Sequence, residues 1–210
     1  SSSWGSAGLQ TQLQAGLNDV QLKYVSGGEL HLDSVKVGGD VVTPPPPPST
    51  NTLPIIGANS PGHLVSATDQ GNNTYVITYQ MTGHNGTLIN ATGIAVKPSG
   101  TAPSGGWRVV TVGHGATGAS DDAAPSLQTG SLKGQINGNV GNIDALLSAG
   151  FVVVMADYEG LGGQANWRHP YMYGISAGRS LIDAARACVG LPNTKINNRL
   201  ASLGFSLGGH

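Results

Sequence analysis

Charged residues are scarce in this chain of 210 residues, and their scarcity excludes several kinds of partner. Asp, Glu, Lys and Arg together make up 10% of the sequence, against roughly 25% in an average soluble domain. The formal net charge is -1. Because nucleic acids and acidic membrane surfaces are bound by dense basic patches, the composition predicts neither partner. Aromatic residues are also few, at 5%, and the abundant Gly, Ser, Thr and Asn are typical of secreted microbial proteins.

Cysteine and long apolar runs are nearly absent as well. Cys188 is the single cysteine, so no disulfide can form within these residues, and we expect a buried, inert thiol in an apolar helical run. No stretch of 18 or more apolar residues occurs, which predicts no integral membrane segment. No group of His, Asp and Cys has the spacing of a zinc site. The chain begins SSSWGS, without Met or a leader, and we expect this start to be internal to a longer protein.

Five consecutive prolines, Pro44–Pro48, mark the clearest boundary in the sequence. Such a run holds an extended helix and predicts a stiff spacer between modules; the alternative is a rigid loop within one domain. Before it, Asp19–Val25 and Glu29–Val37 alternate apolar and polar residues, which predicts a β-hairpin. This stretch faintly resembles the end of a carbohydrate-binding β-sandwich module. We therefore predict a C-terminal remnant of an accessory β-sandwich in residues 1–43 and a proline-rich linker in residues 44–52.

After the prolines, predicted strands alternate with predicted helices. Alternation or continuous apolar character indicates strands at Thr74–Thr82, Asn90–Pro98, Trp107–Val112, Phe151–Ala156 and Arg199–Phe205. One helix is expected at Asn139–Ala149, before the stop signal Gly150. A second is expected at Gly174–Val189, with an apolar stripe that includes Ile182 and a solvated or locally paired row of Arg179, Asp183 and Arg186. This order predicts the α/β class, with a mostly parallel sheet and crossover helices.

The last seven residues, GFSLGGH, place a serine directly after a predicted strand. Ser206 fits G-x-S-x-G, with Gly204 and Gly208 two residues to either side. A strand that reverses sharply into a helix leaves the serine exposed on a strained turn, where side chains at both glycine positions would collide. The N–H of Leu207 can then face the oxygen of an attacked carbonyl. We predict Ser206 as a nucleophile; the alternative is an ordinary glycine-rich turn.

A loop of small residues, His114–Gly118, follows the predicted strand 107–112. In α/β-hydrolases the loop in this place supplies the second backbone donor of the oxyanion hole, and small residues allow the backbone to approach the substrate. The predicted donor is the N–H of Ala116 or of Thr117. Each such donor typically contributes about 2.7–4 kcal/mol in the transition state. The alternative is an ordinary loop at the exit of a strand.

Six short motifs, in their order and spacing, resemble the secretory, lipase A-like family of α/β-hydrolases over about residues 75–210. They are HGATG (114–118), APS (124–126), DYEGLG (157–162), HPY (169–171), DAARA (183–187) and GFSLGG (204–209). The resemblance implies the N-terminal half of an α/β-hydrolase sheet in residues 53–210, truncated after the serine turn. It also implies a secreted esterase or lipase with a Ser–Asp–His triad and no cofactor, and it assigns Ser206 as nucleophile and the Ala116 loop to the oxyanion hole.

The sequence departs from the family pattern in two places. Family members often carry a cysteine just before the Ala-Pro-Ser motif, where this chain has Ala123. The acid and the histidine of the triad follow the serine in α/β-hydrolases, whereas four residues follow Ser206 here. We therefore expect both groups in an absent C-terminal half and expect residues 1–210 alone to be inactive. None of the six histidines is predicted as the general base, and Asp157 and Glu159 are expected to be mainly structural.

The sequence thus predicts a serine hydrolase that cleaves carboxylic esters of small molecules or lipids. Two alternatives stay open at this point. A carbohydrate esterase would use the N-terminal module to bind polysaccharide and would remove acyl groups from it. A non-catalytic binding protein would carry a degenerate hydrolase domain, and it would lack an Asp and a His at downstream strand ends.

Overall fold

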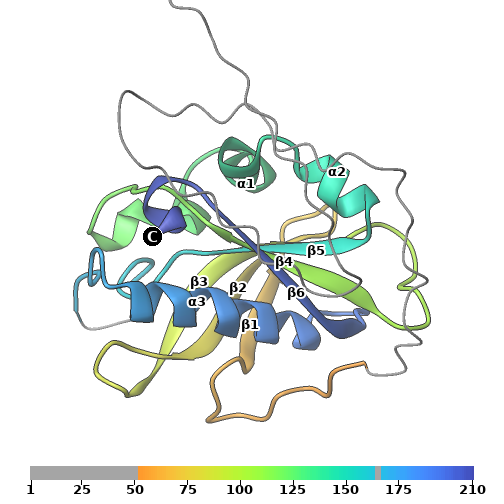
Figure 1. The fold of residues 1–210 in the computed structure, drawn as a ribbon, viewed down its shortest axis with the longest axis horizontal. Coiled ribbons are helices and arrows are strands. Elements are labelled where there is room, and N and C mark those ends of the chain that lie inside the picture. The colour runs from red at the N-terminus through yellow and green to blue at the C-terminus, as the bar shows by residue number, and fades with distance from the viewer. Residues whose placement is uncertain (1–51, 164–166) are drawn as a thin grey trace, which may run out of the picture. The chain divides into compact units, whose positions relative to one another are not determined.

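The computed structural model of the protein describes residues 52–163 and 167–210 (Figure 1). The predicted hairpin of residues 19–37 and the proline run lie outside the described residues, so the accessory module and the linker stay predictions. No helix in the described part of the chain combines the length and the apolar character needed to cross a membrane.

Six strands form one sheet in the order β1-β2-β3-β5-β4-β6. The strands are β1 (Leu64–Asp69), β2 (Thr74–Thr82), β3 (Leu88–Val96), β4 (Trp107–Gly113), β5 (Phe151–Ala156) and β6 (Ile196–Gly204). The five predicted strands are all present, with ends that shift by up to three residues. Strand β1 was not predicted, because all six of its residues are at least partly exposed and no apolar alternation marks it.

The expectation of a mostly parallel sheet is wrong for the described strands. Strand β4 runs parallel to β5 and β6, but the pairs β1/β2, β2/β3 and β3/β5 are antiparallel. The connections β1–β2 and β2–β3 are short polar turns, and a parallel pair needs a crossover of a dozen or more residues. Consecutive strands joined by such turns can pair only by folding back on each other.

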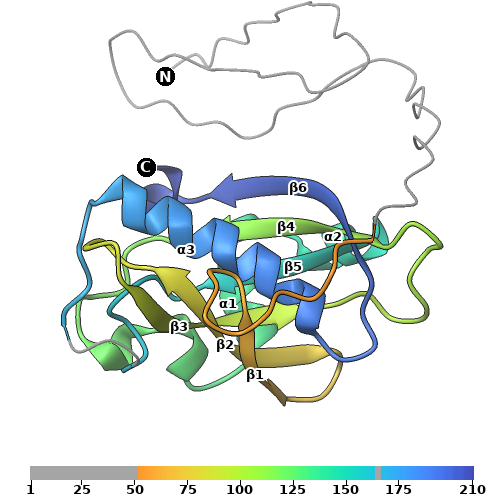
Figure 2. The same cartoon turned by 90° about the horizontal axis from the view of Figure 1, so that it is seen from below.

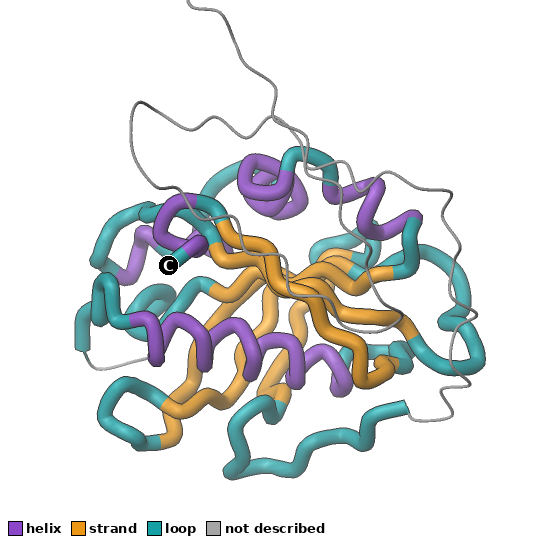
Figure 3. Tube along the Cα trace, in the orientation of Figure 1, coloured by secondary structure: helices purple, strands orange, loops and turns teal. Residues whose placement is uncertain are grey.

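Helices cover both faces of the sheet (Figure 3). Helix α3 (Gly174–Ala187) lies on one face, and α1 (Leu132–Val140) and α2 (Ile143–Ser148) lie on the other. Each face has its own apolar core. Ala184 and Ala187 of α3 pack with Ile77 and Val154, whereas Ile136 and Ile143 of the other layer pack with inward residues of β3, β4 and β5. Burial on both faces explains the continuous apolar runs of β4 and β5.

The single helix expected at 139–149 is instead two helices. Gly141 has a φ of 77°, a left-handed conformation that ends α1 and that glycine adopts without strain. Asn142 then caps α2 by accepting a hydrogen bond from the N–H of Ala145 at 3.0 Å. The start of α1 is capped in the same way, because the Ser131 hydroxyl accepts from the N–H of Gly134. The Gly-Asn pair is therefore a boundary between helices.

Helix α3 agrees with the predicted range, and four short 3-10 segments complete the described elements. Two side chains of α3 lie differently from the prediction: Ile182 is 45% exposed, and Asp183 is buried. Asp183 accepts hydrogen bonds from the N–H of Thr82 and from Arg186, so these two residues of the row are locally paired, whereas Arg179 donates to the carbonyl oxygen of Gly83. Cys188 is buried as predicted, and burial raises the pKa of its thiol to about 12. The 3-10 segments are η1 (Asp121–Ala123), η2 (Pro125–Leu127), η3 (Cys188–Gly190) and η4 (Ser206–Gly209).

Candidate active site

The chain reverses abruptly between β6 and η4. Strand β6 ends at Gly204, and the 3-10 turn begins at Ser206, which has a φ of 51°. A left-handed backbone is uncommon outside glycine and is found preferentially at functional sites. Ser206 is exposed, so its hydroxyl is accessible above the end of the sheet. The turn lies beside the first turn of α3, as both views show (Figures 1 and 2).

Three glycines make this reversal possible by allowing backbone to touch backbone. A Cβ added to Gly204 would overlap the carbonyl oxygen of Gly208, and one added to Gly208 would overlap the carbonyl of Gly113 at the end of β4. A Cβ on Gly113 would in turn lie 2.8 Å from the Gly208 oxygen. The collision expected at the two positions of the motif is therefore real, and Gly113 is a third partner that sequence reasoning missed.

The loop after β4 lies directly against the serine turn. The N–H of Phe205 donates to the carbonyl oxygen of Gly113 at 3.0 Å. A Cβ on Gly115 would lie 3.0 Å from the Phe205 ring and 3.5 Å from the Cβ of Ser206. Two segments about ninety residues apart in sequence are thus neighbours at the same end of two parallel strands.

The backbone N–H groups that the sequence analysis named as oxyanion donors lie in these two segments. Those of Ala116, Thr117 and Leu207 donate to no acceptor within residues 52–163 and 167–210. Ala116 and Thr117 are exposed and Leu207 is partly exposed. Unpaired N–H groups beside an exposed hydroxyl are what an oxyanion hole requires, since the donors must be free for the substrate oxygen.

No histidine in the described part of the chain bonds to the Ser206 hydroxyl. His63 faces the carbonyl oxygen of Ile56, and His84 faces the carboxylate of Glu159. His169 is buried, with its Nδ1 2.8 Å from the carbonyl oxygen of Glu159. His210 is directed toward the start of α3, with its Nε2 3.4 Å from the position of a Cβ on Gly174. The identity of the general base therefore stays a prediction.

Asp157 is a buried carboxylate at the carboxyl end of β5. One of its oxygens accepts the backbone N–H of Ser126 at 2.9 Å, and the other accepts the hydroxyls of Thr92 and Ser126. Burial raises the pKa of Asp157, and these hydrogen bonds oppose the rise. All its partners are structural groups, so Asp157 attaches η2 to the sheet.

Glu159 is equally buried and holds three further segments. One oxygen faces the Nδ1 of His84 and accepts the indole N–H of Trp167, each at 2.7 Å. The other accepts the backbone N–H of His84 and the hydroxyl of Ser176. Burial alone would raise the pKa of Glu159, but the hydrogen bonds from Ser176, His84 and Trp167 outweigh it and lower the pKa. The carboxylate therefore ties the β2–β3 turn to the start of α3.

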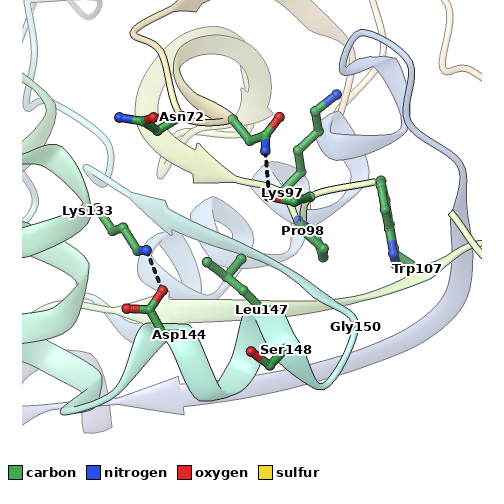
Figure 4. Close-up of a pocket in the computed structure, with 11 residues that line it drawn as sticks. Asn72, Lys97, Pro98, Trp107, Lys133, Asp144, Leu147, Ser148 and Gly150 are labelled. Atoms are coloured by element: carbon green, nitrogen blue, oxygen red, sulfur yellow. Dashed lines mark hydrogen bonds and ion pairs between the residues drawn. The ribbon is translucent and has the colours of Figure 1, made fainter. Parts of the chain in front are cut away.

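Other possible sites in the described part of the chain are few. No three His, Cys, Asp or Glu side chains are grouped there so that they could hold a metal ion. A cavity of about 690 Å³ is lined by Asn72, Lys97, Trp107, Lys133 and Gly150, among others (Figure 4). Trp107 and Gly150 lie where β4 and β5 begin, whereas Ser206 follows the carboxyl end of β6. The cavity therefore lies at the opposite end of the strands from Ser206. It is not part of the candidate active site.

Comparison with solved structures finds two known folds similar to that of this chain. The ligand-bound rice cell wall degrading esterase LipA from Xanthomonas oryzae matches with a TM-score of 0.54 and 24% identity, over 72% of this chain and 44% of that one. Candida antarctica lipase A in its closed state matches with a TM-score of 0.55 and 21% identity, over 77% and 39%. The chain has the α/β-hydrolase fold. No protein-family model and no curated protein sequence matches it.

The resemblance to lipase A-like hydrolases is thereby confirmed at the level of the fold. The chain spans less than half the length of either solved structure, so the activity of a whole α/β-hydrolase is a proposal for it. The site residues Ser206, Ala116, Thr117 and Leu207 likewise rest on the local geometry described above. Sequence reasoning missed Tyr158 and Asn139, which contact the loop after β4; the DYEGLG motif contained the first but gave no sign of that contact.

The contact between Gly208 and Gly113 predicts the effect of one added methyl group. Gly208→Ala is expected to lower the free energy of unfolding by about 1–3 kcal/mol, because the methyl group would push apart two backbone segments. Urea denaturation measures the change. Gly178→Ala in α3 is the matched control, since no atom lies within 4 Å of its added Cβ and alanine favours helix by up to about 1 kcal/mol. Equal midpoints for the two variants would contradict the close approach.

The two buried carboxylates are expected to respond differently when each is replaced by its amide. Asp157→Asn is expected to change the free energy of unfolding by less than about 1 kcal/mol, because the two hydroxyls at one oxygen can rotate and accept from the new NH2 group. Glu159→Gln is expected to cost about 1–3 kcal/mol, because either orientation of its amide sets NH2 against a fixed N–H donor of His84 or Trp167. Urea denaturation at pH 7 compares the variants, and a larger loss for Asp157→Asn would refute this account.

Proposed function

We propose that residues 53–210 are the N-terminal part of a serine hydrolase of carboxylic esters, with Ser206 as the nucleophile. One observation carries the proposal: an exposed serine in left-handed backbone lies beside the N–H groups of Ala116, Thr117 and Leu207, which have no acceptor among the described residues. Electrostatic stabilisation by such prearranged donors is usually the largest single contribution to catalysis of acyl transfer. The α/β-hydrolase fold is consistent with this chemistry, and the site itself carries the argument.

In the proposed mechanism, the Oγ of Ser206 attacks the ester carbonyl carbon while a histidine takes its proton. Negative charge develops on the carbonyl oxygen, and the N–H of Leu207 together with the N–H of Ala116 or Thr117 stabilises it. The tetrahedral intermediate then expels the alcohol, which receives the proton from the histidine. Water, activated by the same histidine, hydrolyses the acyl-enzyme and regenerates the serine.

We propose that the histidine and the acid that orients it follow His210 in the complete enzyme. The order Ser, acid, His along the chain is common to α/β-hydrolases, and the described residues supply no histidine bonded to Ser206. Residues 1–210 alone are then inactive, because an unassisted serine hydroxyl is a weak nucleophile. We also propose secretion, in keeping with the low charge and the six motifs, and an accessory β-sandwich module before the proline linker.

Replacement of Ser206 tests the proposal directly. Ser206→Ala in the full-length protein is expected to lower kcat for a p-nitrophenyl ester by about 10⁴-fold or more, because a nucleophile that acts as a unit with its base cannot be replaced by the remaining groups. Ser202→Ala is the matched control, since this exposed serine lies in β6 four residues earlier. Retained turnover in Ser206→Ala would eliminate the proposed nucleophile, and activity in residues 1–210 alone would eliminate the downstream histidine.

A carbohydrate esterase is the second candidate, and one comparison favours it. The Xanthomonas oryzae protein with the same fold is described as a rice cell wall degrading esterase, and the resemblance in residues 19–37 suggests a carbohydrate-binding module. Acetylated xylan and a triglyceride emulsion, each assayed with the full-length protein and with a variant lacking residues 1–43, separate the candidates. A carbohydrate esterase should prefer xylan and lose that preference on truncation. Faster hydrolysis of triglyceride by both proteins would reject it.

A further inference from the structure

Tyr158 occupies an unusual position directly after β5. It is 1% exposed and has a φ of 71°. A left-handed backbone is strained for a bulky aromatic residue, and it persists only where the surroundings hold it in place. The residue is neither a titrating group of the proposed mechanism nor part of the apolar cores. Its conformation therefore requires an explanation in terms of its contacts.

Two imidazoles hold the ring of Tyr158. The His114 ring lies 4.3 Å away between centroids, at an interplanar angle of 31°. The His169 ring stacks at 5.6 Å and 15°. The hydroxyl of Tyr158 donates to the carbonyl oxygen of His114 at 2.9 Å. Burial raises the pKa of Tyr158 to about 12, so the phenol remains a hydrogen-bond donor throughout the range in which an ester hydrolase is assayed.

The loop that Tyr158 contacts is held at each successive peptide group. The carbonyl of Gly113 accepts from Phe205, and the carbonyl of His114 accepts from Tyr158. The N–H of Gly115 donates to the Oδ1 of Asn139 at 3.0 Å. The carbonyl oxygen of Gly115 lies 2.6 Å from the Nδ1 of His114. Burial lowers the pKa of His114, which favours the neutral imidazole. The Nδ1 contact is much shorter than the 3.5 Å between Nε2 and the carbonyl oxygen of Asp157, and it is a hydrogen bond to Gly115 when Nδ1 carries the proton.

These hydrogen bonds determine the direction in which the N–H of Ala116 points. In a trans peptide the N–H of a residue points away from the preceding carbonyl oxygen, because the peptide group is planar. With the Gly115 carbonyl turned toward the His114 ring, the N–H of Ala116 points to the opposite side. The carbonyl of Ala116 accepts no hydrogen bond from any described residue, so the peptide that carries the Thr117 N–H has no comparable restraint. The geometry distinguishes Ala116 from Thr117, which the sequence did not.

We infer that Tyr158 and His114 are positioning residues that aim the N–H of Ala116 at the oxyanion of the substrate. The inference rests on the proposed function, and it deepens that proposal by naming the second donor and the side chains that orient it. Tyr158 fixes the peptide before Gly115, and His114 fixes the peptide after it. Neither side chain touches the substrate, and both act through the backbone.

Tyr158→Phe in the full-length protein tests the inference, because it removes one hydroxyl and keeps the ring between the imidazoles. We expect kcat for a short p-nitrophenyl ester to fall about 10- to 100-fold with KM changed by less than about twofold, since the oxyanion forms only after binding. The affinity for an alkyl boronic acid, whose tetrahedral adduct places an oxygen in the same hole, should fall by a similar factor. His114→Phe should act in the same direction.

Tyr79→Phe is the matched control. The buried hydroxyl of Tyr79 also donates to a backbone carbonyl, that of Ser180, at 3.0 Å, so the same type of hydrogen bond is lost between β2 and α3. Both tyrosine variants should lower the urea midpoint by similar amounts. Only Tyr158→Phe should change kcat and boronate affinity. If the Tyr158 hydrogen bond were purely structural, the two variants would behave alike.

The outcomes distinguish a failure of the positioning role from a failure of the proposed function. If Ser206→Ala is inactive and Tyr158→Phe has the kcat of Tyr79→Phe, Ser206 stands and the positioning role is overturned. If both tyrosine variants lose activity in proportion to stability, the role of Tyr158 is structural and the inference is again overturned. If Ser206→Ala keeps its activity, the proposed function fails by itself. Should Tyr158→Phe not fold, His114→Phe provides the same comparison of kcat, KM and boronate affinity.

Discussion

The contact between the end of β4 and the serine turn is the constraint on which the rest of the candidate site depends. Gly113, Gly204 and Gly208 meet backbone to backbone, and any Cβ in this place would overlap a neighbouring carbonyl or crowd it. Such contact requires that β4 and β6 be adjacent and parallel and that they end at the same level, as they do. The same contact brings the loop after β4 to Ser206. The adjacency of β4 and β6 in the sheet and the closeness of the loop after β4 to Ser206 thus depend on the same three glycines.

Residues 157–159, directly after β5, hold the surrounding loops in place. Asp157 holds η2, Tyr158 holds the loop after β4, and Glu159 holds the β2–β3 turn and the start of α3. Two of the three are buried carboxylates, and one has left-handed backbone, so each carries a cost in free energy. Dense hydrogen bonding offsets that cost at the carboxylates. The apolar cores on the two faces of the sheet keep β5 fixed, and a fixed β5 allows a three-residue segment to position loops from four parts of the chain.

How much of this could be predicted from sequence depended on whether the signal was local. Apolar runs located β4 and β5, and the steric demand of a sharp turn identified Gly204 and Gly208, because both signals lie within a few residues. The sequence did not reveal Gly113 as a partner of Gly208, since their contact spans about ninety residues. It could not show that β3 pairs antiparallel with β5, because these strands are far apart in the chain, nor the burial of Asp183, which depends on a neighbouring strand. The choice between Ala116 and Thr117 required the orientation of single peptide groups, which no periodicity encodes.

The candidate site separates into two parts that are built differently. The part that would stabilise the oxyanion consists of backbone N–H groups, and its geometry follows from contacts among β4, β5, β6 and α1, all within the described residues. The part that would transfer a proton needs a histidine side chain, and none of those described bonds to Ser206. Backbone donors can be fixed by close packing, whereas a general base must reach the serine across an open face. The oxyanion geometry therefore does not depend on the base, and a histidine from another segment needs only to approach a hydroxyl that the strained turn already exposes.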